Sequence, residues 1–394
     1  MTKCNVKVLM LSKALVVGAY QRKCEELAQL PGVELTVVVP PYWQEAGRRI
    51  DLERLYTAGY ELIVEAMRFN GHFHVHYYPG LARQVRRLQP DILHIDEEPY
   101  NLASFQALRL GQQVGARGLF FTWQNLYRRY AFPFSWLESY VLRHAAYAIA
   151  GNAEAVAVLR RKGYAGPLAV IPQFGVDPAI YTPTNVLRHF ALLRASSSSV
   201  VFSPASFVVG YVGRLVEEKG LLVLLRAVAG LAGDWRLVLI GSGPLQPQIE
   251  RLAASLGIAE RLTFIPGVPS SEMPGYLSQF SVLVLPSLTR PNWKEQFGRV
   301  LVEAMACRVP VVGSDCGEIP QVIGEAGLVV PEGDGEALCQ ALAHLQTDAD
   351  LRQRLGELGR ARVLAHYTQA RIAQETYRVY QEMSDQGMRE SGAP

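Results

Sequence analysis

A short cationic loop in the second half of the chain has the residue types that bind phosphate. The segment Val212-Gly-Arg-Leu-Val-Glu-Glu-Lys-Gly220 follows an apolar run, and glycine at position 213 would let a ligand approach the backbone closely. Arg214 can grip a phosphate with two hydrogen bonds, and Lys219 adds a compact positive charge. The alternative is a solvated turn in which an arginine pairs with a glutamate, which is a common arrangement.

Two carboxylates lie eight residues apart in the segment Glu295-Gln-Phe-Gly-Arg-Val-Leu-Val-Glu303. We expect Gly298 at or near the start of a helix, whose free N–H groups and dipole would favour an anion. Glu295 would lie in the loop before that helix, and Glu303 among apolar residues inside it. A carboxylate in such surroundings needs a partner, which the hydroxyls of a ribose would supply. The alternative is a core glutamate satisfied by a neighbouring arginine or backbone group.

The first half carries a second group of polar side chains. Glu97 and Glu98 follow an apolar run that ends at Ile95, and Gln124 and Asn125 follow the next run along the chain. The amides can hydrogen-bond a sugar, and the glutamates are predicted to contact an acceptor or to act as a base. Alternatively, the two glutamates are loop charges near a helix cap.

Three histidines, His72, His74 and His76, alternate within the segment 72–76. On a strand they would share one face at spacings of about 6.6–7 Å, which is wide for three ligands of one zinc ion. We therefore expect a row of histidines that faces a cleft or solvent, and no metal site.

The segment Gly241-Ser-Gly243 resembles the start of a dinucleotide-binding fingerprint. However, Gln246 stands where the third glycine belongs, and a nicotinamide site is therefore disfavoured.

The elements that would position these residues alternate between short apolar runs and helical patterns. Apolar runs without strict polar alternation are typical of strands buried on both faces. In the first half, the predicted strands are Lys7–Leu11, Leu35–Val39, Phe73–Tyr77, Asp91–Ile95, Gly118–Thr122, Ala146–Ala150 and Leu168–Ile171, and the predicted helices include Gln21–Leu30, Leu81–Leu88 and Trp136–His144. This alternation predicts a parallel sheet with right-handed crossovers.

The same pattern restarts after a segment rich in proline and serine, Asp177–Pro204. Strands are predicted at Val208–Val212, Arg236–Ile240, Leu262–Ile265, Val282–Leu285, Val309–Gly313 and Leu328–Val330, and helices at Leu221–Leu231, Pro247–Leu256, Gly298–Ala306 and Asp334–Leu345. A long helix without a strand partner is predicted over Val363–Met383.

Two Rossmann-like α/β units are therefore predicted within the 394 residues, as the length of the chain also suggests. The predicted domains are 1–177 and 206–369, joined by a linker over 178–205, and the terminal helix covers about 370–394. We expect the two units to face a cleft, with a ligand bound at the carboxyl ends of the strands.

The composition of the chain disfavours several classes of protein. The formal net charge is only +3, whereas nucleic-acid-binding proteins usually carry a stronger or more clustered basic excess. The five cysteines are odd in number and form no Cys-x-x-Cys pair, which disfavours a disulfide framework and indicates a reducing compartment. Neither an export signal nor a membrane-spanning run is evident, and we expect a cytoplasmic protein.

Taken together, these motifs resemble a family 4 retaining glycosyltransferase of the GT-B fold. The resemblance rests on the Gly-Arg-Leu and Glu-Lys-Gly pieces of 213–220, the paired glutamates of 295–303, Gly-Ser-Gly-Pro at 241–244 and Val-Ile-Pro-Gln-Phe-Gly-Val-Asp at 170–177. It is most specific over about 208–330. It implies that the terminal helix crosses back to the first domain, that the first domain binds the acceptor, and that the second binds a nucleotide-sugar donor.

The resemblance also implies roles for individual residues, with no metal or other cofactor. Arg214 and Lys219 would bind the donor diphosphate and stabilise the leaving group, Glu295 would bind hydroxyls of the donor sugar, and Glu303 would bind the ribose. The remaining residues implied in donor binding are Gly18, Gly213, Gly241, Gly267, Val268, Gln296, Phe297, Gly298 and Leu301.

One departure from the family pattern concerns the first domain. Many relatives carry a histidine just after the strand that here ends at Thr122, whereas this chain continues with Trp123, Gln124 and Asn125. Neither amide can take a proton as histidine can. The leading hypothesis is therefore a retaining, metal-independent glycosyltransferase of cell-envelope or exopolysaccharide synthesis. A catalytically weak donor-binding or scaffold protein is the alternative, followed by a nucleotide-sugar epimerase or hydrolase.

The segment Tyr127-Arg-Arg-Tyr-Ala-Phe-Pro-Phe-Ser-Trp136 interleaves aromatic residues with two arginines. Such a segment can rest on an anionic membrane surface. Alternatively, it is a loop of the acceptor site. Contact with the inner face of the cytoplasmic membrane would suit an enzyme that glycosylates a lipid-linked acceptor or another glycan.

Overall fold

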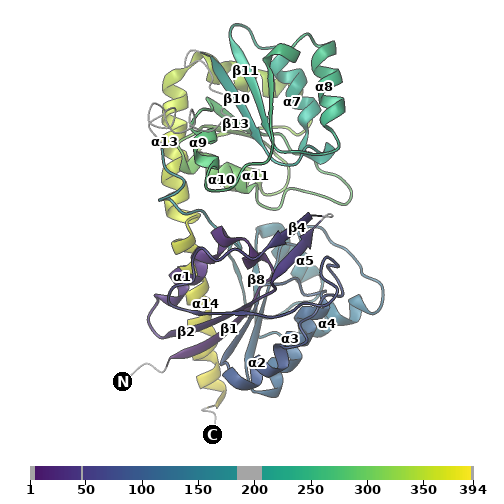
Figure 1. Cartoon of the computed structure of the whole chain (residues 1–394), viewed down its shortest axis with the longest axis vertical. Coiled ribbons are helices and arrows are strands. Elements are labelled where there is room, and N and C mark those ends of the chain that lie inside the picture. Colours follow the sequence, from purple (N-terminus) through teal and green to yellow (C-terminus); the bar gives the residue numbers. More distant parts are fainter. Residues whose placement is uncertain (1–4, 46–47, 184–205, 392–394) are drawn as a thin grey trace. The chain divides into compact units, whose positions relative to one another are not determined.

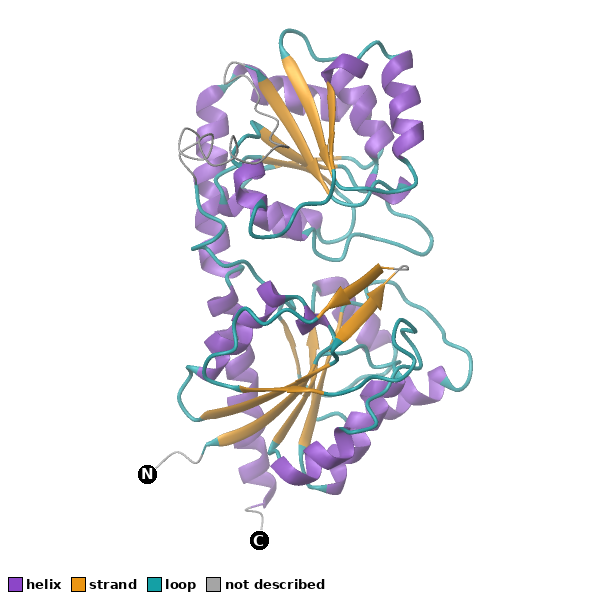
Figure 2. Cartoon of the chain, viewed as in Figure 1, coloured by secondary structure: helices purple, strands orange, loops and turns teal. Residues whose placement is uncertain are grey.

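A computed structural model describes residues 5–45, 48–183 and 206–391. The chain divides into two compact units, of which the first combines Met1–Gly175 with Gln369–Pro394 and the second is Val176–Thr368. Each unit is a parallel sheet with helices on its faces (Figures 1 and 2). The predicted pair of Rossmann-like units is thereby confirmed.

The sheet of the first unit has seven strands in the order β5-β2-β1-β6-β7-β8-β9, and all neighbours run parallel. The strands are β1 (Val6–Leu11), β2 (Val33–Val39), β5 (Glu61–Val64), β6 (Ile92–Ile95), β7 (Arg117–Thr122), β8 (Tyr147–Ala150) and β9 (Leu168–Val170). The helices are α1 (Arg22–Ala28), α2 (Leu81–Leu88), α3 (Leu102–Gln113), α4 (Phe134–His144), α5 (Ala153–Arg161) and α14 (Gln369–Ser391). A hairpin of β3 (Tyr42–Glu45) and β4 (Arg48–Asp51) stands apart from this sheet.

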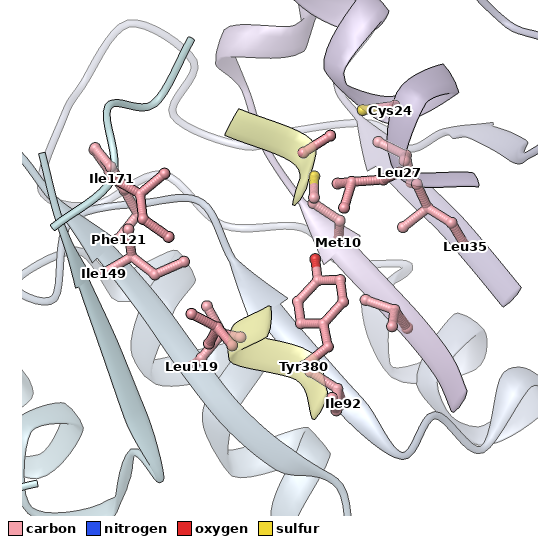
Figure 3. Close-up of a cluster of buried hydrophobic side chains, with 14 of the residues drawn as sticks. Met10, Cys24, Leu27, Leu35, Ile92, Leu119, Phe121, Ile149, Ile171 and Tyr380 are labelled. Atoms are coloured by element: carbon pink, nitrogen blue, oxygen red, sulfur yellow. The ribbon is translucent and has the colours of Figure 1, made fainter. Parts of the chain in front are cut away.

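Side chains of β1 alternate between two cores, as strand geometry requires. Met10 belongs to the cluster that contains residues of α1 and α14, whereas Leu9 belongs to the cluster that contains residues of α2 to α5. Figure 3 shows Tyr380 of α14 among Met10, Ile92 and Leu119. The prediction that the terminal helix packs on the first unit is therefore confirmed.

The sheet of the second unit has six parallel strands in the order β12-β11-β10-β13-β14-β15. The strands are β10 (Phe207–Val212), β11 (Trp235–Ile240), β12 (Leu262–Ile265), β13 (Val282–Leu285), β14 (Val311–Ser314) and β15 (Leu328–Val330). The helices are α7 (Leu221–Ala229), α8 (Gln246–Ser255), α9 (Met273–Leu277), α10 (Arg299–Ala306), α11 (Ile319–Ile323), α12 (Gly335–Thr347) and α13 (Ala349–His366). Short 3₁₀ turns complete the units.

The terminal helical region differs from its prediction. The single helix predicted over Val363–Met383 is two helices, because α13 ends at His366 and α14 begins at Gln369. The interruption at residues 367 and 368 coincides with the boundary between the units. There the backbone N–H of Val176 donates to the carbonyl oxygen of Tyr367 over 2.9 Å, so the two chain crossings lie side by side.

The beginning of the predicted linker packs within the second unit. Tyr181 is only 4% exposed, and its hydroxyl oxygen lies 3.3 Å from the carbonyl oxygen of Ser270. The rest of the predicted linker, 184–205, lies outside the described residues.

Candidate functional site

Glycine backbone brings the ends of three strands of the second unit close together. Gly241 has a φ of 137°, and a Cβ atom there would lie 2.0 Å from the carbonyl oxygen of Gly213. Gly220 has a φ of 68°, and a Cβ atom there would lie 1.8 Å from the carbonyl oxygen of Pro286, which follows β13. Side chains are excluded from both positions, and the loop 213–220 therefore lies directly on this edge of the sheet.

Lys219 and Glu295, which are 76 residues apart, meet at this edge. The Nζ atom of Lys219 lies 2.5 Å from Oε2 of Glu295, and the hydroxyl group of Ser287 donates to the same oxygen over 2.9 Å. The ammonium group also lies 4.8 Å from the ring centroid of Trp293. Both charged residues were predicted as site residues from the sequence, whereas their pairing with each other was not, and no sequence pattern pointed to Ser287 or Trp293.

Arg214 is more accessible than Lys219. Its side chain is 66% exposed and lies 3.6 Å from Oε1 of Glu218. The backbone below it is held by Tyr211, whose hydroxyl group donates to the carbonyl oxygen of Arg214 over 2.7 Å. The arginine–glutamate pair that was considered as an alternative is present, and its long distance and exposure make it a weak interaction.

Glu303 is buried in α10, which begins after Gly298, as predicted. The Nε atom of Arg299 lies 2.8 Å from its Oε1 atom, and the hydroxyl group of Tyr181 donates to the same oxygen over 3.2 Å. Burial, followed by the negative charge of Glu303, raises the pKa of Tyr181, so its hydroxyl group stays a donor. Nothing in the local sequence pointed to Tyr181, which the sequence analysis placed in the linker.

The other residues implied in donor binding are distributed around the same unit. Phe297 is 8% exposed and its ring centroid lies 5.7 Å from that of Tyr367. The side chain of Leu301 is fully buried in the core. Gln296 is exposed, and Gly267 and Val268 follow β12 in a loop that is open around Gly267.

Gly18 belongs to the first unit, where the segment Glu53–Leu55 covers it. Its N–H group donates to Oε2 of Glu53 over 2.8 Å, and an added Cβ atom would lie 2.6 Å from Cγ of Leu55. Gln21 fixes this segment by donating to the carbonyl oxygen of Glu53 over 2.6 Å. A carboxylate thus occupies the N–H group that a ligand anion would use.

Glu97 lies inside a buried ion pair at the carboxyl ends of β1 and β6. Its Oε2 atom binds the ammonium group of Lys13, lies 3.5 Å from Nε2 of His76 and accepts from the amide of Asn101 over 3.3 Å. Burial alone would raise its pKa, but Lys13 and His76 lower the pKa of Glu97 to about 2. An ionised and fully engaged carboxylate of this kind is a poor proton acceptor near neutral pH.

Glu98 has a different environment from its neighbour. Its Oε2 atom accepts from the hydroxyl group of Thr122 over 2.6 Å, and its Oε1 atom accepts from the N–H group of Trp123 over 2.8 Å. Burial raises the pKa of Glu98 to about 7, and these two hydrogen bonds only partly oppose the rise. Glu98 therefore changes its charge near neutral pH while holding the end of β7.

Replacing Glu98 by glutamine should flatten the pH dependence of stability between about pH 5 and 7. In this window the folded protein keeps the proton that the unfolded chain has released, so wild-type stability falls as the pH rises, by at most about 1.4 kcal/mol per pH unit. Urea unfolding at several pH values would measure the slope. Glu250→Gln, at an exposed position, is the control, and a slope unchanged by Glu98→Gln would contradict the assignment.

The two amides that follow β7 are engaged inside the first unit. The Nε2 atom of Gln124 donates to the hydroxyl group of Tyr130 over 3.1 Å, and its Oε1 atom accepts from Lys162 over 2.9 Å. Asn125 donates to Oε2 of Glu154 over 3.3 Å. Neighbouring side chains thus fix the positions of both amide groups in the absence of a sugar.

The histidine row and the strand Phe73–Tyr77 predicted from the sequence are wrong. The segment turns, with the N–H group of His76 donating to the carbonyl oxygen of His72 over 3.2 Å, and only Tyr77 forms an isolated bridge. His76 is buried beside Trp43, whereas His74 lies among other aromatic rings. Packing against the hairpin of β3 and β4, which the sequence analysis missed, overrides the local alternation.

Within the described ranges, no helix is both long and apolar enough to cross a membrane. In the same part of the chain, no group of three or more histidine, cysteine or acidic side chains is arranged to hold a metal ion.

Two family models match the two halves of the chain. Residues 21–179 match the model described as Glycosyltransferase Family 4, and residues 196–362 match the model described as Glycosyl transferases group 1. Together they span both structural units.

Curated relatives match over part of their length. A GDP-mannose-dependent alpha-(1-6)-phosphatidylinositol monomannoside mannosyltransferase of Mycolicibacterium smegmatis is 35% identical over 39% of this chain and 42% of its own length. A D-inositol 3-phosphate glycosyltransferase of Corynebacterium jeikeium is 34% identical over 48% of this chain and 46% of its own length. The chain thus spans slightly less than half the length of these relatives.

Solved structures share the fold over nearly the whole chain. Sucrose-phosphate synthase from Thermosynechococcus elongatus superimposes with a TM-score of 0.72 at 21% identity, covering 97% of this chain and 100% of that one. Anabaena Alr3699/HepE in complex with UDP gives a TM-score of 0.71 at 17% identity, covering 96% and 100%. The two family models show that the chain belongs to glycosyltransferase family 4. The solved structures show that it has the GT-B fold.

Proposed function

We propose that the protein transfers a sugar from a nucleoside-diphosphate donor to a glycan, lipid-linked or small-molecule acceptor, with retention of anomeric configuration. The observation that carries the proposal is the group formed by Lys219, Glu295 and the nearby Arg214 at the carboxyl edge of the second sheet. Family membership and the GDP-mannose dependence of one relative support a nucleotide-sugar donor. Structures of Alr3699/HepE with UDP and UDP-glucose are consistent with that choice.

In the proposed reaction, the bond between the sugar and the diphosphate breaks while negative charge develops on the departing oxygen. Arg214 and Lys219 offset that charge, which is the main requirement of this chemistry, and no metal is assigned to the site. Glu295, whose Oε2 atom binds Lys219, hydrogen-bonds hydroxyls of the donor sugar. The hydroxyl group of the acceptor attacks from the face that the leaving group vacates and passes its proton to the departing diphosphate oxygen, so the configuration is retained.

Other residues of the second unit are assigned to the ribose, the phosphate and the base of the donor. Glu303 binds the ribose through Oε2, because Arg299 and Tyr181 both contact Oε1. The backbone of 296–298 contacts the sugar and phosphate, and the loop at 267–268 contacts the base. The N–H group of Gly18, which the resemblance to the family implies in donor binding, is held by the carboxylate of Glu53 in the first unit.

Replacing Glu303 by glutamine should raise the KM for the donor about 10- to 100-fold and change kcat little. A hydrogen bond to a charged group typically contributes this much to binding, and the ribose does not change during the reaction. Initial rates at varied donor concentration would measure the effect. An effect confined to the free energy of unfolding would support the alternative of a core glutamate held by Arg299.

A donor-binding protein without efficient transfer is the second candidate function. It is favoured by Trp123 standing where many relatives carry histidine, and by the internal hydrogen bonds of Gln124 and Asn125.

Thermal unfolding with a panel of nucleoside diphosphates and nucleotide sugars, without added metal, tests the proposed donor site. Binding to the folded protein raises Tm by mass action. We expect one nucleotide sugar to give the largest shift and to lose its sugar to an added acceptor. A shift without transfer to any acceptor would favour the second candidate, and no shift with any donor would contradict both.

A further inference from the structure

Aromatic and basic side chains are concentrated along α3, α4 and the loop that precedes α4, in the first unit. The two helices lie side by side (Figure 1). Phe132 in the loop is 82% exposed and Trp136 in α4 is 46% exposed. We call this the α3–α4 face, and it is defined by Phe105, Arg109, Arg128, Arg129, Phe132, Trp136, Tyr140, Arg143 and His144.

Four aromatic rings of the α3–α4 face, those of Phe105, Trp136, Tyr140 and His144, form a continuous row. The ring centroid of Phe105 lies 5.0 Å from that of Trp136 and 4.9 Å from that of Tyr140. Tyr140 in turn stacks on His144 with 4.1 Å between centroids. Half-buried rings thus support the exposed ones, and tryptophan and tyrosine are the residues that favour the boundary between water and lipid.

The charge of this part of the chain is strongly one-sided. Between Pro99 and Asn152 the sequence holds five arginines and a single acidic residue, Glu138. That carboxylate lies in the interior, 2.5 Å from the ammonium group of Lys162. Arg109, Arg128, Arg129 and Arg143 are exposed, whereas Arg117 is directed to the carbonyl oxygen of Met383.

We propose that the α3–α4 face docks on an anionic lipid surface. Phe132 and Trp136 would enter the headgroup region while the four exposed arginines bind lipid phosphates. A second copy of the chain is a poorer occupant, because a two-fold interface would bring two sets of four arginines together. The proposal concerns binding only and does not depend on the transfer reaction.

Co-sedimentation of the whole protein with vesicles tests this surface. We expect stronger binding to vesicles of phosphatidylcholine and phosphatidylglycerol (1:1) than to phosphatidylcholine alone, with a loss of binding at high salt. Phe132→Ser/Trp136→Ser should weaken binding at least tenfold. Arg128→Gln/Arg129→Gln should weaken it about 25-fold at low salt, because each arginine near an anionic surface contributes roughly fivefold.

Matched variants elsewhere in the chain control for general loss of apolar area or charge. Leu358→Ser/Leu364→Ser and Arg251→Gln/Arg354→Gln remove exposed residues of the second unit and should leave vesicle binding within twofold of wild type. Tm values would confirm that all variants fold. Equal binding to both kinds of vesicle, or wild-type binding by the Phe132/Trp136 variant, would overturn the proposal. So would a dimer in sedimentation velocity that this variant abolishes, because the occupant would then be a second copy.

Discussion

Replacement of Lys219 by methionine is expected to reduce the rate of sugar transfer about 10²- to 10³-fold at saturating donor. The ammonium group is the charge that we assign to the departing diphosphate, and removal of one such group from a preorganised site typically costs this much in kcat. The position of Lys219 is well defined, because its Nζ atom lies 2.5 Å from Oε2 of Glu295 and 4.8 Å from the ring centroid of Trp293. Arg214→Ala should also slow transfer, by at least tenfold.

The measurement is the initial rate with the donor that gives the largest thermal shift. Lys219→Met leaves the carboxylate of Glu295 without its cation, so its Tm must be measured in parallel. Arg226→Gln removes a positive charge from an exposed position of α7 in the same unit and should keep nearly the wild-type rate. Near-normal rates in both Lys219→Met and Arg214→Ala would contradict the proposed role of this edge of the sheet.

Replacement of Lys13 by methionine is expected to lower the free energy of unfolding by about 3–5 kcal/mol. Removing one partner of a buried ion pair leaves an uncompensated charge in the interior, and this is among the costliest single changes. The side chain of Lys13 is 11% exposed, and that of Glu97 is fully buried. The change also removes an ammonium group that lies 4.8 Å from the ring centroid of Phe73. Urea unfolding of the purified variant would measure the loss.

A double variant separates the charge from the packing at this site. Lys13→Met/Glu97→Leu should recover much of the lost stability, because neither charge then remains buried. In the wild type, the pKa of Glu97 is lowered to about 2 from an ordinary value of 4.5. Its contribution to stability is therefore complete above about pH 4.5 and is lost as the pH falls from there toward 2. A double variant that is no more stable than Lys13→Met would contradict this explanation. So would a Lys13→Met variant whose free energy of unfolding falls between pH 4.5 and 2 as steeply as that of the wild type.

Local patterns predicted all six strands of the second sheet, together with α1, α2 and α4 of the first unit. Apolar runs without alternation predicted β12, β13 and β15 with the bounds observed. A helical pattern predicted α2 with the bounds observed. Prediction failed where packing outweighed local preference. The alternation around His74 is that of a strand, yet Trp43 packs edge-on against Phe73 with 5.6 Å between ring centroids, and the segment turns.

The sequence by itself determined the class of fold, the positions of the glycines at the strand ends, and the charged residues that follow those strands. Those features depend on hydrophobic period and residue type, which act over a few neighbouring positions. Only the tertiary structure decided the partners: Lys219 with Glu295 across 76 residues, Lys13 with Glu97 across 84, and Tyr181 with Glu303 across 122. Such pairs depend on strand order and on the crossovers between strands, which bring distant residues to one sheet edge and which no local propensity encodes.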